Sequence, residues 1–195
     1  IKFASFVNQG NLNYTYSSGA IQVYASGIAS AQMTQSYELA LLKNEGGLNV
    51  NLSGSSPADF NYASIVYDLG SVNFTLTRVY NYVNHTYNSN LYSSTYGMVT
   101  SVNNNHISLR FSANYGDVNF IGSSQITLNK ELKVFAITGQ NNVDYINVHN
   151  YGEINVVNVN TGVYYLYIAG FSPTLSNDKV IKNSLNAGNI TFADI

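Results

Sequence analysis

Short runs in which apolar and polar residues alternate constrain the fold of this chain more than any other feature of its sequence. Ile107, Leu109 and Phe111 alternate with polar residues, and the same pattern recurs over 48–53 and 72–77. Successive side chains of a β-strand point to opposite faces, so each run predicts a strand with one buried and one solvent-facing side. Further strands are expected over 11–16, 20–24, 37–42, 96–102, 117–121, 125–128, 132–138 and 189–193. The chain is therefore predicted to be all-β, with a short helix over 28–36 as an alternative for that segment.

Turn signals between these runs favour antiparallel pairing. The runs 143–149, 153–159 and 163–169 are separated by the polar turns 150–152 and 160–162, each of which ends in glycine. Glycine readily adopts the positive φ that a tight hairpin needs, so these runs predict an antiparallel meander. Strands roughly ten residues apart are typical of a β-sandwich, either immunoglobulin-like or jelly-roll-like. We find no linker and no internal repeat that can be aligned, which favours a single head domain over residues 11–195.

The composition excludes several classes of function. Only 9% of the 195 residues are charged, there is no Cys, and the net charge is −2. Charged residues normally make up about a quarter of a soluble domain, so neutral hydrogen-bonding groups must cover this surface. The charge balance offers no basic surface for nucleic acid. No apolar stretch reaches the roughly 20 residues of a membrane-spanning helix. We expect neither a nucleic-acid partner nor a membrane span.

Residues able to perform catalysis or bind metal are few and scattered. The three histidines, His85, His106 and His149, lack the close spacing of a metal motif and are interpreted as exposed surface residues. No G-x-S-x-G sequence marks a serine nucleophile. A carboxylate pair of the glycosidase kind remains open for residues such as Asp59, Asp68 and Asp117. We expect no enzymatic activity, no metal and no cofactor.

Two other residue patterns suggest surface functions. Tyrosines gather at 80, 82 and 87 and at 164, 165 and 167, where they either bind sugar rings or act as good strand formers. The scarcity of carboxylates also predicts tolerance of strong acid, because few native ion pairs exist to be lost. Asn-x-Ser/Thr sequons predict N-linked glycans, although their number is what chance gives in so Asn-rich a chain. They lie at Asn13, Asn51, Asn73, Asn84 and Asn189.

The first ten residues form a segment of their own. Residues 1–7 are mostly apolar and prone to form a strand, and Gln9 and Gly10 follow as breakers. Such a segment is an aggregation hazard when it is exposed, so it must be buried in its own sheet or in that of a neighbouring subunit. We interpret residues 1–10 as a donor-strand tail that inserts into the next subunit. Its candidate contact residues are Ile1, Phe3, Ala4, Phe6 and Val7.

Together these features resemble the subunits of archaeal extracellular filaments, and most closely those of the thin glycosylated threads of thermoacidophilic archaea. The resemblance lies in the overall character of a Cys-free, Tyr/Asn-rich β-domain with the apolar segment Ile1–Val7. It implies a β-rich head, polymerisation by donor-strand complementation and a coat of N-glycans. The chain departs from archaeal type IV pilins, which open with a long hydrophobic helix.

The sequence therefore predicts a structural subunit of an extracellular filament with a role in cell adhesion or biofilm. Its partners would be identical subunits in a helical homopolymer. A first residue other than Met fits a removed signal peptide, and hence an extracellular location, and it fits a chain trimmed from a longer one equally well. The alternative function is a carbohydrate- or surface-binding β-sandwich module, such as an S-layer or viral coat component. Within the filament hypothesis, the C-terminal strand is an alternative donor strand.

Overall fold

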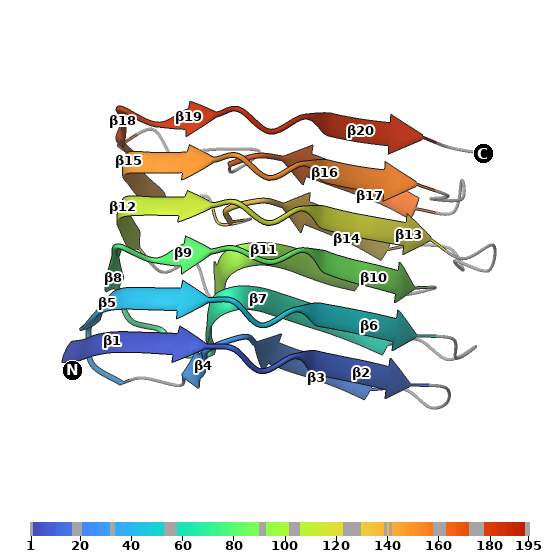
Figure 1. Cartoon of the computed structure of the whole chain (residues 1–195), viewed down its shortest axis with the longest axis horizontal. Helices are drawn as coiled ribbons and strands as arrows, with labels where there is room; N and C mark the ends of the chain where they lie inside the picture. Colours follow the sequence, from blue (N-terminus) through green and yellow to red (C-terminus); the bar gives the residue numbers. More distant parts are fainter. Residues whose placement is uncertain are drawn as a thin grey trace.

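The computed structural model of the chain is a parallel β-solenoid. It describes residues 2–16, 21–31, 34–52, 58–89, 93–101, 106–122, 130–138, 140, 142–157, 163–171 and 178–193. The chain winds in successive coils, and its strands stack in register with those of neighbouring coils to form three sheets, A, B and C (Figure 1). Every strand pair in these sheets is parallel, so the expected antiparallel β-sandwich is wrong.

The three sheets run the length of the stack. Sheet A contains, in spatial order, β1 (Lys2–Asn8), β5 (Tyr37–Asn44), β8 (Phe74–Thr77) with β9 (Tyr80–Asn81), β12 (Ile107–Asn114), β15 (Val143–Asn150) and β18 (Ile181–Lys182) with β19 (Leu185–Asn186). Sheet B contains β2 (Leu12–Tyr16), β6 (Leu48–Leu52), β10 (His85–Ser89), β13 (Val118–Gly122), β16 (Ile154–Val157) and β20 (Ile190–Ala193). Sheet C contains β17 (Val163–Ala169), β14 (Lys130–Phe135), β11 (Ser93–Ser101), β7 (Ala58–Asp68) and β3 (Ile21–Ser26), with β4 (Ala29–Ala31) beside β7.

The strand register reveals an internal repeat that the sequence analysis missed. Tyr37 pairs with Phe74, Phe74 with Ile107 and Ile107 with Val143, so successive coils differ by 37, 33 and 36 residues. Periods of 20–50 residues are the signature of solenoids. The unequal coil lengths and the low identity between coils conceal this period.

The predicted meander is wrong for a geometric reason. β15, β16 and β17 follow one another along the chain, yet they lie in sheets A, B and C and pair with strands of neighbouring coils. The turn at Asn150–Gly152 bends the chain from one sheet into the next and does not reverse it. A glycine after a polar residue marks a turn equally well in both cases, so the local signal did not distinguish them.

The strand positions themselves are largely confirmed, because period-2 alternation reports burial whatever the partner strand. Inward residues of successive coils stack into columns, for example Leu39, Leu76, Leu109 and Tyr145 in sheet A, all of them buried. The segment proposed as an alternative helix contains β4, while 32–33 and the expected strand 125–128 lie outside the described residues.

Each strand level of sheet A bends at one residue with positive φ. The bend residues are Ser5, Leu41, Arg78, Phe111, Asn147 and Asn183, with φ between 50° and 58°. Non-glycine residues adopt this conformation at a cost of roughly 1–2 kcal/mol each. The pairing of β12 with β15 omits Phe111, whose side chain projects into solvent. The bend thus creates a corner where exposed apolar and cationic side chains gather.

Candidate functional site

A ladder of asparagines, buried in the four inner coils, follows the inner side of the turn between sheets A and B. Each Nδ2 donates a hydrogen bond to Oδ1 of the asparagine in the next coil, with N–O distances between 2.7 and 3.1 Å. In five of the six coils Nδ2 also donates to the carbonyl oxygen two residues further along the chain. The members are Asn8, Asn44, Asn81, Asn114, Asn150 and Asn186. This ladder satisfies polar groups inside the solenoid and holds the coils in register.

Glycine two residues after the ladder asparagine lets the coils approach closely. A Cβ placed on Gly116 would clash with the carbonyl oxygen of Val83, and one on Gly152 would clash with that of Gly116. The Asn-x-Gly motif recurs in five coils, and in four of them, at Gly46, Gly116, Gly152 and Gly188, an added Cβ would meet the backbone of the previous coil. Val83 takes the glycine position in the coil of β9 and β10. A search for this motif at a period near 36 would have found the repeat.

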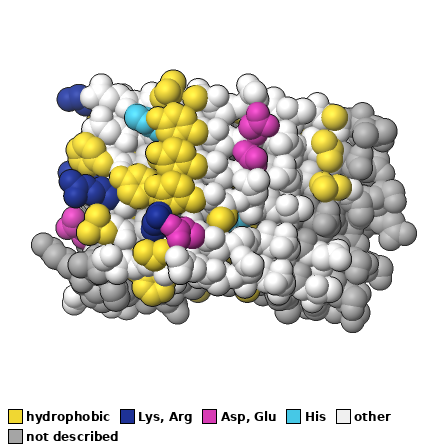
Figure 2. Space-filling view, viewed as in Figure 1, with side chains coloured by type: hydrophobic (Ala, Val, Ile, Leu, Met, Phe, Trp, Pro, Cys, Tyr) yellow, Lys and Arg dark blue, Asp and Glu magenta, His cyan; other side chains and the backbone are white. Residues whose placement is uncertain are grey.

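The residue directly after the ladder asparagine points outward, and in three coils it is tyrosine. The rings of Tyr82 and Tyr115 are stacked with centroids 4.9 Å apart, and those of Tyr115 and Tyr151 with centroids 5.1 Å apart. Figure 2 shows a column of hydrophobic side chains on this face, and we call these three residues the tyrosine ladder. Partial burial, and secondarily the neighbouring phenols, raise the pKa of Tyr115, so its hydroxyl is neutral at physiological pH.

The two ends of the tyrosine ladder differ. At the lower end Lys43 Nζ lies 4.9 Å from the centroid of the Tyr82 ring and forms an ion pair with Glu45. At the upper end the Tyr151 hydroxyl lies 2.9 Å from Nδ1 of His149, whose ring meets the tyrosine ring edge-on. Because the flat ring faces cover one another, mainly ring edges and hydroxyls face solvent. This geometry does not offer the row of open ring faces that stacking on sugars needs.

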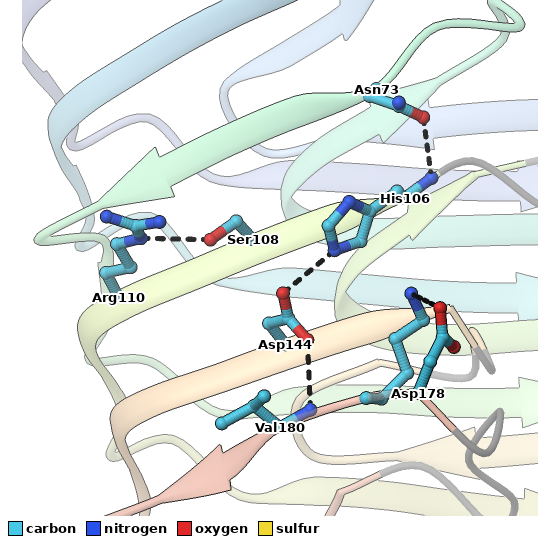
Figure 3. Close-up of polar contacts among 8 residues, drawn as sticks. Asn73, His106, Ser108, Arg110, Asp144, Asp178 and Val180 are labelled. Atoms are coloured by element: carbon cyan, nitrogen blue, oxygen red, sulfur yellow. Dashed lines mark hydrogen bonds and ion pairs between the residues drawn. The ribbon is translucent and has the colours of Figure 1, made fainter.

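A His–Asp pair lies where β12 and β15 of sheet A begin. Nε2 of His106 lies 2.9 Å from Oδ2 of Asp144, and Oδ1 of Asp144 accepts a hydrogen bond from the backbone N–H of Val180 (Figure 3). Asn73 Oδ1 accepts from the backbone N–H of His106 in the same way. Among the described residues no serine or threonine hydroxyl is hydrogen-bonded to the His106 ring, so no nucleophile accompanies it. The pair links neighbouring coils, as the asparagine ladder does.

His85 contradicts the interpretation of all three histidines as exposed residues. It starts β10, where the register places it in an inward column between Leu48 and Val118, and it is 2% exposed. Burial lowers its pKa to about 3. Its Nε2 lies 3.2 Å from Asn81 Oδ1, while Nδ1 has no hydrogen-bond partner among the described groups. A buried neutral histidine opposes the predicted acid tolerance, because the unfolded chain gains a proton that the folded chain excludes.

The predicted donor strand lies in the protein's own sheet. β1 pairs in parallel with β5 and forms the edge of sheet A. Phe6 and Val7 are exposed, although Leu42, the partner of Phe6 in the next coil, is buried. Phe3 and Ala4 belong to β1, and Ile1 lies outside the described residues. Insertion of this strand into another subunit stays a prediction.

All five predicted glycosylation sites are solvent-exposed in the structure, at Asn13, Asn51, Asn73, Asn84 and Asn189. Asn189 Nδ2, the atom a glycan would modify, donates to Glu153 Oε1 at 3.2 Å. The hydrogen bonds of the Asn13, Asn73 and Asn84 side chains use their oxygen atoms. The geometry therefore favours these three sites over Asn189, and glycan occupancy stays a prediction.

The described part of the chain shows neither a metal-binding cluster nor a membrane-spanning helix. No group of three or more His, Asp or Glu side chains in the described part of the chain could hold a metal ion. No helix in that part is long and apolar enough to cross a membrane. Comparison of the chain with protein-family models, curated proteins and solved structures gave no match. Any functional assignment therefore rests on the geometry described above.

Proposed function

We propose that this chain is a structural subunit of an extracellular filament in which copies stack end to end as further coils of one continuous solenoid. The observation that carries the proposal is the open coil at the β20 end. Ile190 and Phe192 are 46% and 50% exposed, whereas their partners one coil earlier, Ile154 and Val156, are fully buried. Another coil laid on β20 would bury these side chains as the coils within the chain do.

The opposite end offers a matching surface. β1, β2 and β3 are the edge strands there, and a hollow between the sheets is lined by residues that include Asn8, Leu12 and Tyr62. In the register of sheet B, the next position in the column of Ile190 is Leu12 of a second copy. In sheet A, Leu185 would meet Val7 in the same way. Both pairs are apolar.

The asparagine ladder supports the same junction. Asn186 donates to Gly188 O through one N–H, and the Asn8 oxygen accepts from the Gly10 N–H. An amide side chain has two donors and two acceptor positions. Asn8 of a second copy, placed one coil beyond Asn186, would continue the ladder with the geometry of its internal steps.

This arrangement changes the expected mode of strand exchange. β1 keeps its pairing with β5 and offers its free edge to β18 and β19 of the next copy, so strands add edge to edge and none is inserted. Exposed strand edges are templates for such pairing. A contact between two different surfaces that repeats without closing generates a filament. Glycans on the exposed sequons would solvate a surface poor in charge.

The test introduces charge at the junction. Ile190→Lys combined with Phe192→Lys places two cations in the proposed contact, whereas Thr191→Lys places one on the outward face of the same strand. Native and Thr191→Lys proteins are expected to form filaments in negative-stain micrographs, and the double variant to stay dispersed with native circular dichroism. Filaments of normal length from the double variant, or none from the native chain at high concentration, would refute end-to-end stacking.

A further inference from the structure

The tyrosine ladder occupies an exposed face that the end-to-end contact does not use. Tyr82, Tyr115 and Tyr151 are 44%, 44% and 42% exposed. Leu41 and Phe111, at the corner of sheet A, add exposed apolar surface on the same side. Contiguous apolar surface of this kind marks an interaction site more often than isolated exposed residues do.

The spacing of the ladder restricts what can cover it. Its ring centroids are 4.9 and 5.1 Å apart, which is close to the roughly 4.7–4.9 Å separation of neighbouring strands in any β-sheet. A partner that meets the phenol edges row by row must carry the same repeat. A second copy of this chain, aligned along the same axis, carries it by construction.

Charge is distributed unequally on the two sides of the ladder. Arg78, Arg110 and Lys182 lie on the corner side. Glu38 and Asp144 share one register column of sheet A on the same side, and Asp144 is paired with His106. Asp117 and Glu153 lie on the sheet B side. Figure 2 shows Lys and Arg at one margin of the face and a pair of acidic side chains across the hydrophobic column from it. Apart from Asp144, none of these charged residues forms an ion pair with another described residue.

This distribution selects one orientation for a pair of copies. A twofold axis parallel to the solenoid axis, passing between two facing copies, places the cationic margin of each opposite the acidic margin of the other. A twofold axis perpendicular to the solenoid axis places cations opposite cations. Opposed like charges at an interface are costly, so the parallel arrangement is favoured.

We propose that two copies pair side by side with parallel solenoid axes, through the tyrosine ladder, with the cationic margin of each copy (Arg78, Arg110 and Lys182) facing the acidic margin of the other (Asp117 and Glu153). The contact is isologous: the same surface serves both copies, which is the commonest form of a symmetric dimer. It requires no end-to-end contact, and in a filament it would join two strands of stacked subunits laterally.

The experiment separates this contact from end-to-end stacking. All proteins carry Ile190→Lys and Phe192→Lys, so that only the lateral contact remains, and their mass is measured by sedimentation velocity across a concentration series. The parent is expected to form a dimer. Tyr115→Ala should weaken the dimer at least about tenfold, since a central aromatic residue dominates a contact of this kind. Lys133→Glu, in β14 of sheet C on the far side, is the control and should leave the dimer intact.

Charge exchange provides the decisive arm. Arg78→Glu with Arg110→Glu makes an acidic variant, and Asp117→Asn with Glu153→Lys makes a basic one. Asparagine at 117 keeps an oxygen for the hydrogen bond that Asp117 Oδ1 accepts from the backbone N–H of Glu153. Each variant alone should be monomeric, and an equimolar mixture should recover a heterodimer. A monomeric parent, a dimer unaffected by Tyr115→Ala, or no recovery on mixing would overturn the proposal. Retention of the monomer on a polysaccharide matrix through Tyr115 would do so as well.

Discussion

Replacing Asn114 with alanine tests how much of the stability of the solenoid depends on the buried ladder. Asn114 is 1% exposed and takes part in three hydrogen bonds, each with an N–O distance of 2.8 Å. It accepts from Asn81 Nδ2 and donates to Gly116 O and Asn150 Oδ1. Alanine removes all three bonds and leaves a buried N–H, a carbonyl oxygen and an amide oxygen without partners.

The magnitude follows from these unpaired groups. A buried polar group left without a partner costs roughly 1–3 kcal/mol, so the three groups that Asn114→Ala leaves unpaired should lower the free energy of unfolding by about 3–9 kcal/mol. Domains of this size are stable by only about 5–15 kcal/mol. The loss is therefore a large fraction of the total, and partial unfolding around β12 is expected at moderate urea concentration.

A matched control lies on the outer surface. Asn155 Nδ2 donates to Asn119 Oδ1 at 3.0 Å, so this bond also joins neighbouring coils, although it runs from the later coil to the earlier one, opposite to the buried ladder. Both side chains are only half-buried, and water can replace the bond. Asn155→Ala should cost less than about 1 kcal/mol. The measurement is urea denaturation followed by circular dichroism, with the mid-transition and slope compared among the three proteins. Equal destabilisation by the two substitutions would refute the reasoning that burial of the ladder makes it important.

The buried histidine, the turn glycines and the exposed sequons each give a further prediction. Burial lowers the pKa of His85 to about 3. The free energy of unfolding should therefore fall by about 1.4 kcal/mol per pH unit as the pH drops from about 6.5 toward 3. His85→Gln should flatten this pH dependence in denaturation curves, and an unchanged slope would contradict the role given to His85. Gly152→Ala should destabilise the fold by about 1–3 kcal/mol, because the added Cβ meets Gly116 O. Gly10→Ala should be nearly neutral in a thermal melt, because its Cβ meets only Asn8 Oδ1 at 3.7 Å. Native material should exceed the 21.3 kDa mass of the bare chain by whole glycans, with Asn13, Asn73 and Asn84 preferred over Asn189. An intact mass equal to the bare chain would exclude N-glycosylation.

The tyrosine ladder shows why the candidate site lay beyond sequence reasoning. Tyr82 lies close to Tyr80 and Tyr87 along the chain, and sequence proximity groups it with them. The stacked partners of Tyr82 and Tyr115 are 33 and 36 residues away, and only the coil register brings them together. The asparagine and glycine ladders depend on the same register, and their turn motif resembled that of a hairpin.

The sequence by itself determined that this protein is all-β and where most of its strands lie, because alternation reports burial irrespective of the partner strand. It was wrong on the inward face where a strand bends, since Phe111, in phase with the buried Ile107 and Leu109, is exposed. It also determined that the chain lacks cysteine chemistry and carries little charge. Only the tertiary structure decided that the strands pair in parallel across coils, that His85 is buried, and that asparagines and tyrosines form ladders. Those features arise from contacts between residues one coil apart, and a local pattern holds no information on which distant segment will lie beside it.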